Sequence, residues 1–202
     1  MLKRLIPVAL CTLLLVSPIL AQEDQQFTSE DGQATFTYPA DWFAVEDEQG
    51  DFILSNAELT EEQIASGVFD QELDEDQIFL VISVYDPQRQ PEGQFIVPNG
   101  PPLFLLGFYS GLFSFIFSPG FGSAAIVTFE EPELVTVDNV EFAVGHLAIT
   151  EAGETSYVAI IISLLNDNVH LATSLAGSVD SLDNFLETAL EIVSTVEYTP
   201  QE

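Results

Sequence analysis

The sequence predicts an α+β protein, in which an antiparallel sheet is covered by helices on both faces in an α/β/α sandwich. Many short apolar stretches are separated by turn signals, as in an antiparallel sheet. Residues 78–85 and 157–165 are almost continuously apolar, which predicts strands that are buried on both faces. An amphipathic helix pattern closes the chain. Strands of this kind need a layer on each side, so we expect helices on both faces.

The first half of the chain alternates between strand and turn signals. Ala34, Phe36 and Tyr38 alternate with polar residues after the hairpin signal Asp31-Gly32. Thr60 and Gln63 have the spacing of a capping box and predict a short helix. We expect strands at 34–38, 42–45, 51–55 and 78–85.

The second half begins with a Pro-rich loop, residues 86–101, and an uncharged segment, residues 102–118. Further strands follow, with turns expected at Asp138-Asn139 and at residues 166–168. Apolar residues on one helical face predict a helix from about residue 179 to residue 193, capped by Ser178 or Ser181. A last short strand is expected at 196–198.

The N-terminus has the pattern of a secretory signal peptide. Lys3 and Arg4 precede an apolar run, and Ala21 supplies a small residue before a cleavage site. We therefore expect a signal peptide at 1–21, a linker at 22–26 and one domain at 27–200. The protein would then be secreted, periplasmic or on the cell surface. An uncleaved anchor and a lipoprotein modified at Cys11 are the alternatives.

The charge of the chain excludes several classes of partner. Removal of residues 1–21 leaves Arg89 as the only basic residue against 33 acids. Nucleic acids and anionic lipids are therefore not expected partners, because both are bound through Lys and Arg. The same cleavage removes the only Cys, so stability must come from packing. The hydrophobic content of 47% is that of a folded protein.

The uncharged segment 102–118 is the main candidate for function. As a helix it would be about 26 Å long, short of a hydrocarbon core of roughly 30 Å. One interpretation is a core helix with Leu103, Leu106, Ser110, Phe113 and Phe117 facing inward. The other is an interaction surface, because exposed apolar patches mark partners or membranes. The contact residues of that surface would be Phe104, Phe108, Leu112, Phe113 and Phe115.

A run of acids at 58–76 suggests a weak calcium site. Calcium takes six to eight oxygen ligands, which clustered carboxylates can supply. The candidate ligands recur at every second position: Asp70, Glu72, Asp74 and Asp76. The run does not fit the EF-hand pattern, so a solvated acidic loop is the alternative. We expect no other cofactor.

No pattern of catalytic residues stands out. His146 and His170 lie in strand-like stretches, and we expect each to face solvent or a polar pocket. Ser110 stands one position late for a nucleophile elbow. Gly120 and Gly122 match a dinucleotide fingerprint by letter, but a strand pattern follows them instead of a helix. We expect a protein that is not an enzyme, with an unrecognised carboxylate site as the alternative.

The stretch "FTSEDGQATFTYPADWFAVED" resembles the opening of the PsbP-like proteins, where a short hairpin runs into a Tyr-Pro-x-x-Trp element. The closing pattern of two long strands, an amphipathic helix and a terminal strand is also similar. The resemblance implies the PsbP-like α/β/α fold and a general habit of binding partners, and it implies no reaction. This chain lacks the basic surface that the photosystem subunit of the family uses.

These observations predict an exported, non-enzymatic accessory or binding module at the cell envelope. Its apolar segment would contact a protein partner or a neutral membrane interface. The same segment makes a homodimer plausible, with the helix packed against a copy of itself. Weak calcium binding and an unrecognised enzyme are the alternatives.

Overall fold

The computed structural model describes residues 24–66, 76–88, 97–116, 125–151 and 153–200. Within them are three helices: α1 (Glu61–Ser66), α2 (Pro102–Ile116) and α3 (Val179–Ser194). The strands of the first half are β1 (Gln25–Thr28), β2 (Ala34–Tyr38), β3 (Phe43–Glu46), β4 (Phe52–Ser55) and β5 (Phe79–Tyr85). The second half adds β6 (Ile126–Phe129), β7 (Glu133–Val137), β8 (Val140–Glu151), β9 (Glu154–Leu164), β10 (His170–Gly177) and β11 (Glu197–Tyr198).

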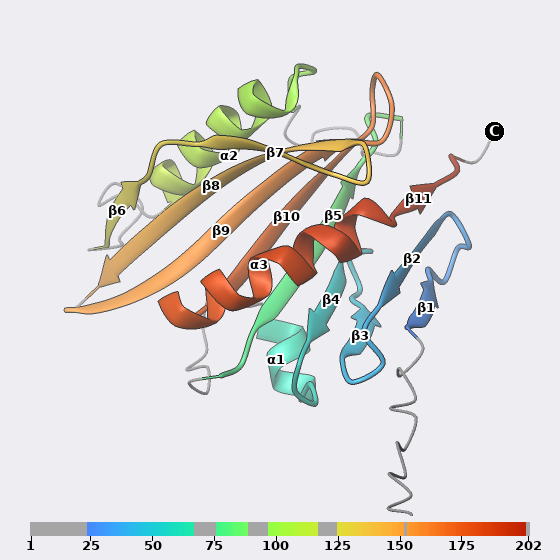
Figure 1. Cartoon of the computed structure of the whole chain (residues 1–202), viewed down its shortest axis with the longest axis horizontal. Helices are drawn as coiled ribbons and strands as arrows, with labels where there is room; N and C mark the ends of the chain where they lie inside the picture. Colours follow the sequence, from blue (N-terminus) through green and yellow to red (C-terminus); the bar gives the residue numbers. More distant parts are fainter. Residues whose placement is uncertain (1–23, 67–75, 89–96, 117–124, 152, 201–202) are drawn as a thin grey trace, which may run out of the picture.

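The strands form two sheets in which neighbouring strands are antiparallel (Figure 1). The large sheet has the order β3-β4-β5-β10-β9-β8-β6, and β7 also pairs with β8. The small sheet has the order β1-β2-β11. The α+β class with antiparallel strands is therefore confirmed. The expectation of one sheet was wrong, because β11 returns to pair with β2 rather than with the large sheet.

The turns that the sequence predicts are held by local hydrogen bonds and by residues with positive φ. Asp138 and Asn139 have φ of 48° and 68° between β7 and β8, and such angles suit a two-residue hairpin. Gly50 has φ of 85° between β3 and β4, a conformation that glycine adopts without steric cost. An Asp47 carboxylate oxygen accepts the N–H groups of Gln49 and Asp51 in the same turn, at 2.8 and 2.9 Å.

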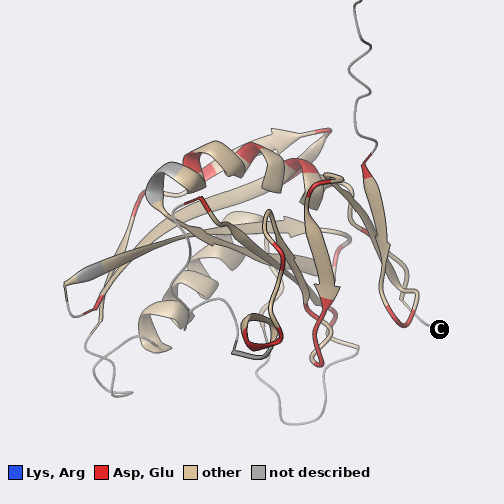
Figure 2. Cartoon of the chain, turned by 90° about the horizontal axis from the view of Figure 1, so that it is seen from below, with Lys and Arg blue, Asp and Glu red and all other residues tan. Residues whose placement is uncertain are grey.

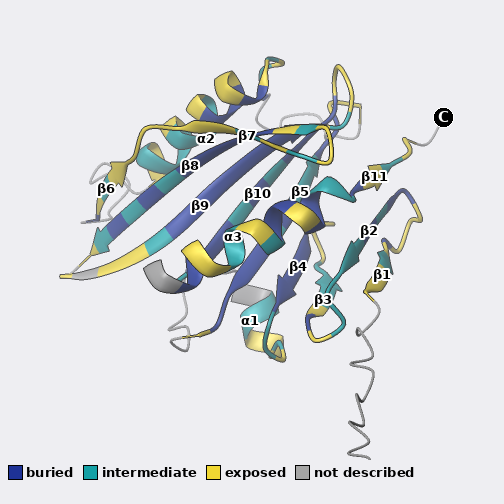
Figure 3. Cartoon of the chain, in the orientation of Figure 1, coloured by how far each residue is buried: buried dark blue, intermediate teal, exposed yellow. Residues whose placement is uncertain are grey.

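Side chains alternate along the central strands and divide the core into two clusters. In β9, Ala159 and Ile161 join the first cluster, whereas Val158, Ile160 and Ile162 join the second. Helix α3 contributes Leu182, Ala189, Leu190, Ile192 and Val193 to the first cluster. Helix α2 contributes Leu105 and Leu106 to the second. Figure 3 shows the central strands as the most continuously buried part of the chain.

Both predicted helix caps are present. Gln63 accepts the Thr60 N–H at 2.9 Å, and the Thr60 hydroxyl accepts the Gln63 N–H at 3.2 Å, as in a capping box. Of the two candidate caps for α3, Ser178 is the N-cap, since its side chain accepts the Ser181 N–H. Ser181 is instead a buried residue of the first turn.

Candidate functional site

Helix α2 is seated on the large sheet through two leucines. Its fifteen residues carry no charge, and no red or blue residue appears on it in Figure 2. Leu105 and Leu106 are buried at 0% and 1% exposure. Leu106 lies directly over Gly145 of β8, where an added Cβ would stand 3.2 Å from both leucine methyl groups. The glycine thus allows the helix to approach the strand closely.

The opposite side of α2 is apolar and exposed. Phe104 and Phe115, two of the five predicted contact residues, are 53% and 57% exposed. The other three, Phe108, Leu112 and Phe113, are half-buried, and both phenylalanines of this group pack against the second core cluster.

The inward face that we predicted for this helix was partly wrong. Leu106 does face inward, but Leu103 is 43% exposed, and Leu105 takes the buried position instead. Phe117 lies outside the described residues. Since every side of the helix is apolar, its sequence does not mark the side that meets the sheet.

Exposed apolar residues of the neighbouring sheet edge lie on the same sheet face as α2. Phe129 of β6 pairs with Leu147, and Leu134 of β7 pairs with Ala143. Leu147 and Ala143 belong to the second core cluster, so their partners point to the same side as α2. We call the combined set the apolar α2 surface: Leu103, Phe104, Phe115, Ile116, Phe129 and Leu134.

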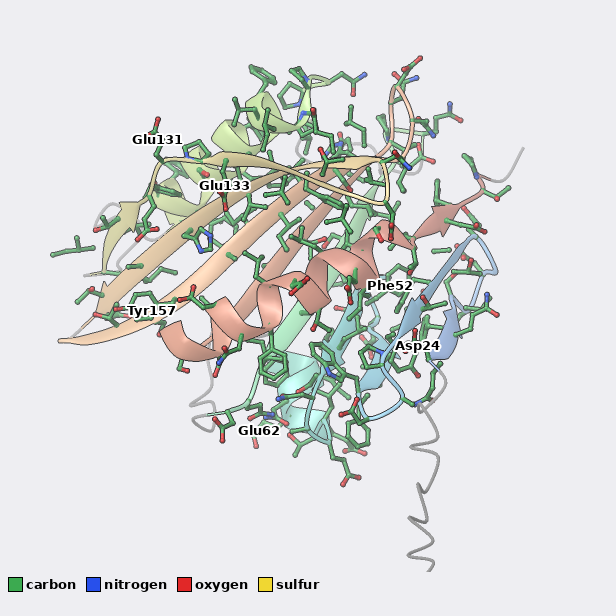
Figure 4. The ribbon with its side chains drawn as sticks, viewed as in Figure 1. Asp24, Phe52, Glu62, Glu131, Glu133 and Tyr157 are labelled. Carbon is green, nitrogen blue, oxygen red and sulfur yellow. The ribbon has the colours of Figure 1, made fainter. Side chains whose placement is uncertain are left out.

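Acids border the edge of this surface. Glu131 lies between β6 and β7 and points away from the sheet (Figure 4). Glu141 is exposed and stands two residues before Ala143, hence on the α2 side of β8. All three basic residues of the chain lie outside the described part, so no positive side chain balances these acids there.

Of the four candidate calcium ligands, Asp70, Glu72 and Asp74 lie outside the described residues. Asp76 is exposed, and its carbonyl accepts a hydrogen bond from Asn56 at 2.8 Å. Among the described residues, no three potential metal ligands come together.

Two other predictions concern the segment around α2. Gly120 and Gly122, which match a dinucleotide fingerprint by letter, lie outside the described residues. None of the described helices is long and apolar enough to cross a bilayer.

The two histidines differ in their surroundings. His146 is half-buried and lines a hollow of about 260 Å³ with Tyr157 and Asp183, as we expected of a strand residue at a polar pocket. For His170 the expectation was wrong, because this residue is only 1% exposed. Its ring stacks on Tyr85 at a centroid distance of 4.8 Å, and its Nε2 lies 2.9 Å from the Tyr109 hydroxyl.

Burial keeps this histidine–tyrosine pair neutral. Desolvation lowers the pKa of His170 to about 4. The pKa of Tyr109 is raised, first by desolvation and then by the nearby Tyr85 and Asp51. The imidazole therefore stays unprotonated and the phenol stays protonated at pH 7. The pair is suited to holding α2 against β10, and it is poorly suited to exchanging protons at that pH.

A groove of about 430 Å³ opens beside this pair, where β5 continues past the first residue of β4. Strand β4 pairs with β5 only up to Ile82, so Ser83, Val84 and Tyr85 border the groove. The hairpin turns before β2 and β4 form the opposite wall. Nine residues with polar side chains line what we call the acidic groove: Ser29, Asp31, Glu46, Gln49, Asp51, Ser83, Tyr85, Tyr109 and Tyr198.

The three carboxylates of the groove have different partners. Asp31 accepts the Ser29 hydroxyl at 2.8 Å, and Glu46 accepts the Glu30 N–H at 2.7 Å. The pKa of Asp51 is raised, mainly by desolvation, although a hydrogen bond from Ser83 lowers it and the charge of Asp47 raises it further. Sequence reasoning missed this groove, because separate turns, strands and helix α2 each contribute at most three of its residues.

Comparisons with known proteins identify the fold. No protein-family model and no curated protein sequence matches the chain. The solution structure of cyanobacterial PsbP (CyanoP) from Synechocystis sp. PCC 6803 matches with a TM-score of 0.51 and 11% identity. That match covers 90% of this chain and 96% of CyanoP.

Two further structures match with lower similarity. A crystal structure from Bacteroides thetaiotaomicron has a TM-score of 0.48 at 16% identity, over 89% of this chain and 50% of that one. The protein of unknown function PA94 from Pseudomonas aeruginosa has a TM-score of 0.41 at 9% identity, over 89% and 99% of the two chains. The CyanoP match, together with the α+β architecture described above, shows that this chain has the PsbP-like fold.

Proposed function

We propose that this protein is an exported, non-enzymatic binding module of the cell envelope, and that the apolar α2 surface is its contact site for a protein partner. One observation carries the proposal. Leu103, Phe104, Phe115 and Ile116 of an uncharged helix are each at least 43% exposed. Contiguous apolar patches on a folded protein usually mark an interaction site.

The two long helices provide an internal comparison. We infer that α2 and α3 are the outer layers of an α/β/α sandwich, since each packs on a different core cluster. Helix α3 has the outer face of an ordinary surface helix, where Asp183, Glu187 and Glu191 are exposed. Helix α2 has phenylalanine and leucine at the corresponding outer positions. Packing against the sheet does not account for these exposed side chains, whereas a partner would.

A protein partner fits this surface better than a membrane or a second copy. Helices that lie in a membrane interface usually carry Lys and Arg beside their apolar face, and α2 has neither. The flanking Glu131 and Glu141 would meet the same acids of a second copy, and like charges repel. We therefore infer a partner whose apolar patch is bordered by Lys or Arg, which would complement these acids.

The neutral histidine–tyrosine pair supports the non-enzymatic part of the proposal. His170 and Tyr109 do not change charge near pH 7, so they offer no general acid or base there. Their hydrogen bond and the stacked Tyr85 ring give them a structural role.

Site-specific photo-crosslinking in the host cells tests the proposal. A photoreactive phenylalanine analogue is placed at position 104 or 115, and at Glu187 on the outer face of α3 as the matched control. We expect one crosslinked protein from positions 104 and 115 and none from 187. Changing Leu103 and Ile116 to Ser should remove that product. The identified partner should then bind the purified chain directly.

Three other results would contradict the proposal in distinct ways. Crosslinks to lipid alone would indicate a membrane contact. A product with twice the mass of the chain would indicate self-association. Equal products from 104, 115 and 187 would mean that α2 is not a preferred contact surface. Mass spectrometry of the protein from the envelope fraction tests export, since the mature chain should begin at Gln22.

A further inference from the structure

We propose that the acidic groove binds an organic ammonium ion, such as an aliphatic amine or a quaternary ammonium compound. This inference goes beyond the proposed contact through α2 and does not depend on it. It rests on the size of the groove, the charges that line it and the aromatic residues among its lining.

The groove has the size of a small-molecule site. Its volume of about 430 Å³ falls within the range of roughly 300 to 1,000 Å³ that is usual for ligand pockets. Its walls are also fixed before any ligand arrives. The Ser29 hydroxyl accepts the Ala34 N–H at 2.9 Å, and Asp47 holds the turn that presents Asp51.

The charge of the groove selects for a cation. Asp31, Glu46 and Asp51 reach it from different turns and strand ends. No Lys or Arg is present in the described part of the chain to neutralise them. Asp51 is the decisive group, because its carboxylate is partly buried and has the Ser83 hydroxyl as a hydrogen-bond donor. A partly desolvated carboxylate that meets no Lys or Arg among the described residues is stabilised most by a ligand that carries a positive charge.

Aromatic rings favour an organic cation over a metal ion. Tyr109, Tyr198 and Phe52 line the groove, and an ammonium group is attracted to the face of such rings. The Tyr109 hydroxyl already bonds His170, and the Tyr198 hydroxyl already bonds Asp86 at 2.9 Å. Both hydroxyls are therefore already engaged within the protein. A metal ion is disfavoured, because the described residues place no three potential ligands together.

Other ligand classes fit less well. An anion would meet three carboxylates and no positive group in the described part of the groove. A neutral polyol would bond the hydroxyls of Ser29 and Ser83, but it would bring no positive charge to Asp51. Apolar wall residues such as Val84 and Ala172 also suit the methylene or methyl groups of an amine.

NMR titration of the purified full chain tests the inference. The probes are tetramethylammonium chloride and 1,4-diaminobutane at pH 7.5, with sodium chloride at equal ionic strength and sorbitol as the neutral comparison. We expect saturable shifts of the amide signals of Gly50, Asp51, Ser83 and Tyr109 with at least one of the two amines. Sorbitol and sodium chloride should leave these signals in place.

Two variants distinguish a site from a general attraction of cations. D51N keeps the shape of the side chain and should weaken amine binding about tenfold or more. E187Q removes the same charge from the distant outer face of α3 and should change binding less than about twofold. A172L narrows the groove without changing its charge and should also weaken binding. The amide spectra of the free variants report whether each one is folded.

Several results would overturn the inference. Amide shifts that rise linearly with amine concentration and do not saturate would mean that the amines are attracted only by the overall negative charge of the protein. Equal losses of amine affinity in D51N and E187Q would mean the same. Saturable binding of sorbitol without binding of either amine would indicate a polyol site. If A172L fails to fold, the comparison of D51N with E187Q still decides the question.

Discussion

The Tyr109 hydroxyl lies 2.9 Å from Nε2 of His170, and this contact joins α2 to β10. His170 is 1% exposed, and its ring also stacks on Tyr85 of β5. A helix that otherwise packs through apolar side chains such as Leu105, Leu106 and Phe113 thus has a directional polar anchor. The anchor fixes how α2 is rotated about its axis, and therefore which of its apolar residues face outward.

The first prediction concerns the pH dependence of stability. Because the pKa of His170 falls from 6.5 unfolded to about 4 folded, its stabilising contribution is complete above pH 6.5. It is lost as the pH falls through 6.5 towards 4, by up to about 3 kcal/mol. Urea unfolding at pH 7 and pH 4.5 measures this loss. The variant H170F provides the comparison, since the many carboxylates titrate equally in both proteins.

The difference in unfolding free energy between wild type and H170F should therefore shrink as the pH is lowered. A difference that is constant from pH 7 to pH 4.5 would show that His170 is not held neutral. Direct NMR titration of the imidazole should give a midpoint near 4.

The second prediction concerns the seat of α2. L106A should lower the free energy of unfolding by about 2 to 5 kcal/mol, because it leaves a cavity over Gly145. G145A should cost about 1 to 3 kcal/mol, since its Cβ would crowd the leucine methyl groups. L103A should change the free energy of unfolding by no more than about 0.5 kcal/mol relative to wild type, because Leu103 is exposed. Chemical denaturation measures all three, and a cost for L103A equal to that of L106A would contradict the described orientation of α2.

The third prediction concerns Gly100, which precedes α2. A Cβ at this position would overlap the ring of Phe104, so G100A should displace that ring. We expect crosslinking from position 115 to persist and contacts that involve Phe104 to weaken. Changes in the NMR signals of the Phe104 ring would report the displacement. An unaltered ring environment in G100A would contradict the packing of Phe104 on Gly100.

The fourth prediction concerns Asp51. Because its pKa is raised in the folded protein, the ionised carboxylate destabilises the fold above that pKa, and the penalty is relieved as the pH falls through it. D51N should therefore raise the free energy of unfolding at pH 7, whereas E187Q is the control for a simple loss of charge. Amine binding should decline as acidification protonates Asp51. A D51N variant less stable than wild type at pH 7 would contradict this assignment.

Local patterns in the sequence were sufficient for most of the elements. Alternation of apolar and polar residues correctly predicted the strand at 34–38. The spacing of Thr60 and Gln63 correctly predicted the capped helix α1. The small sheet was missed, because the pairing of β11 with β2 joins opposite ends of the chain. No local pattern reports such a pairing.

The candidate site was harder to predict for two physical reasons. Helix α2 is apolar all round, so periodicity could not show that Leu105 rather than Leu103 faces the sheet. The acidic groove is built from residues far apart in the sequence, and its decisive Asp51 looks like an ordinary turn residue.

The central claim is that the outer face of α2 makes contact with a partner and does not form core. The most direct measurement is made on one variant in which Leu103, Phe104, Phe115 and Ile116 are all changed to Ser. Its free energy of unfolding is determined beside its binding to the crosslinked partner. We predict an unfolding free energy close to that of wild type and loss of binding. A variant that unfolds, or one that binds as well as wild type, would contradict the claim.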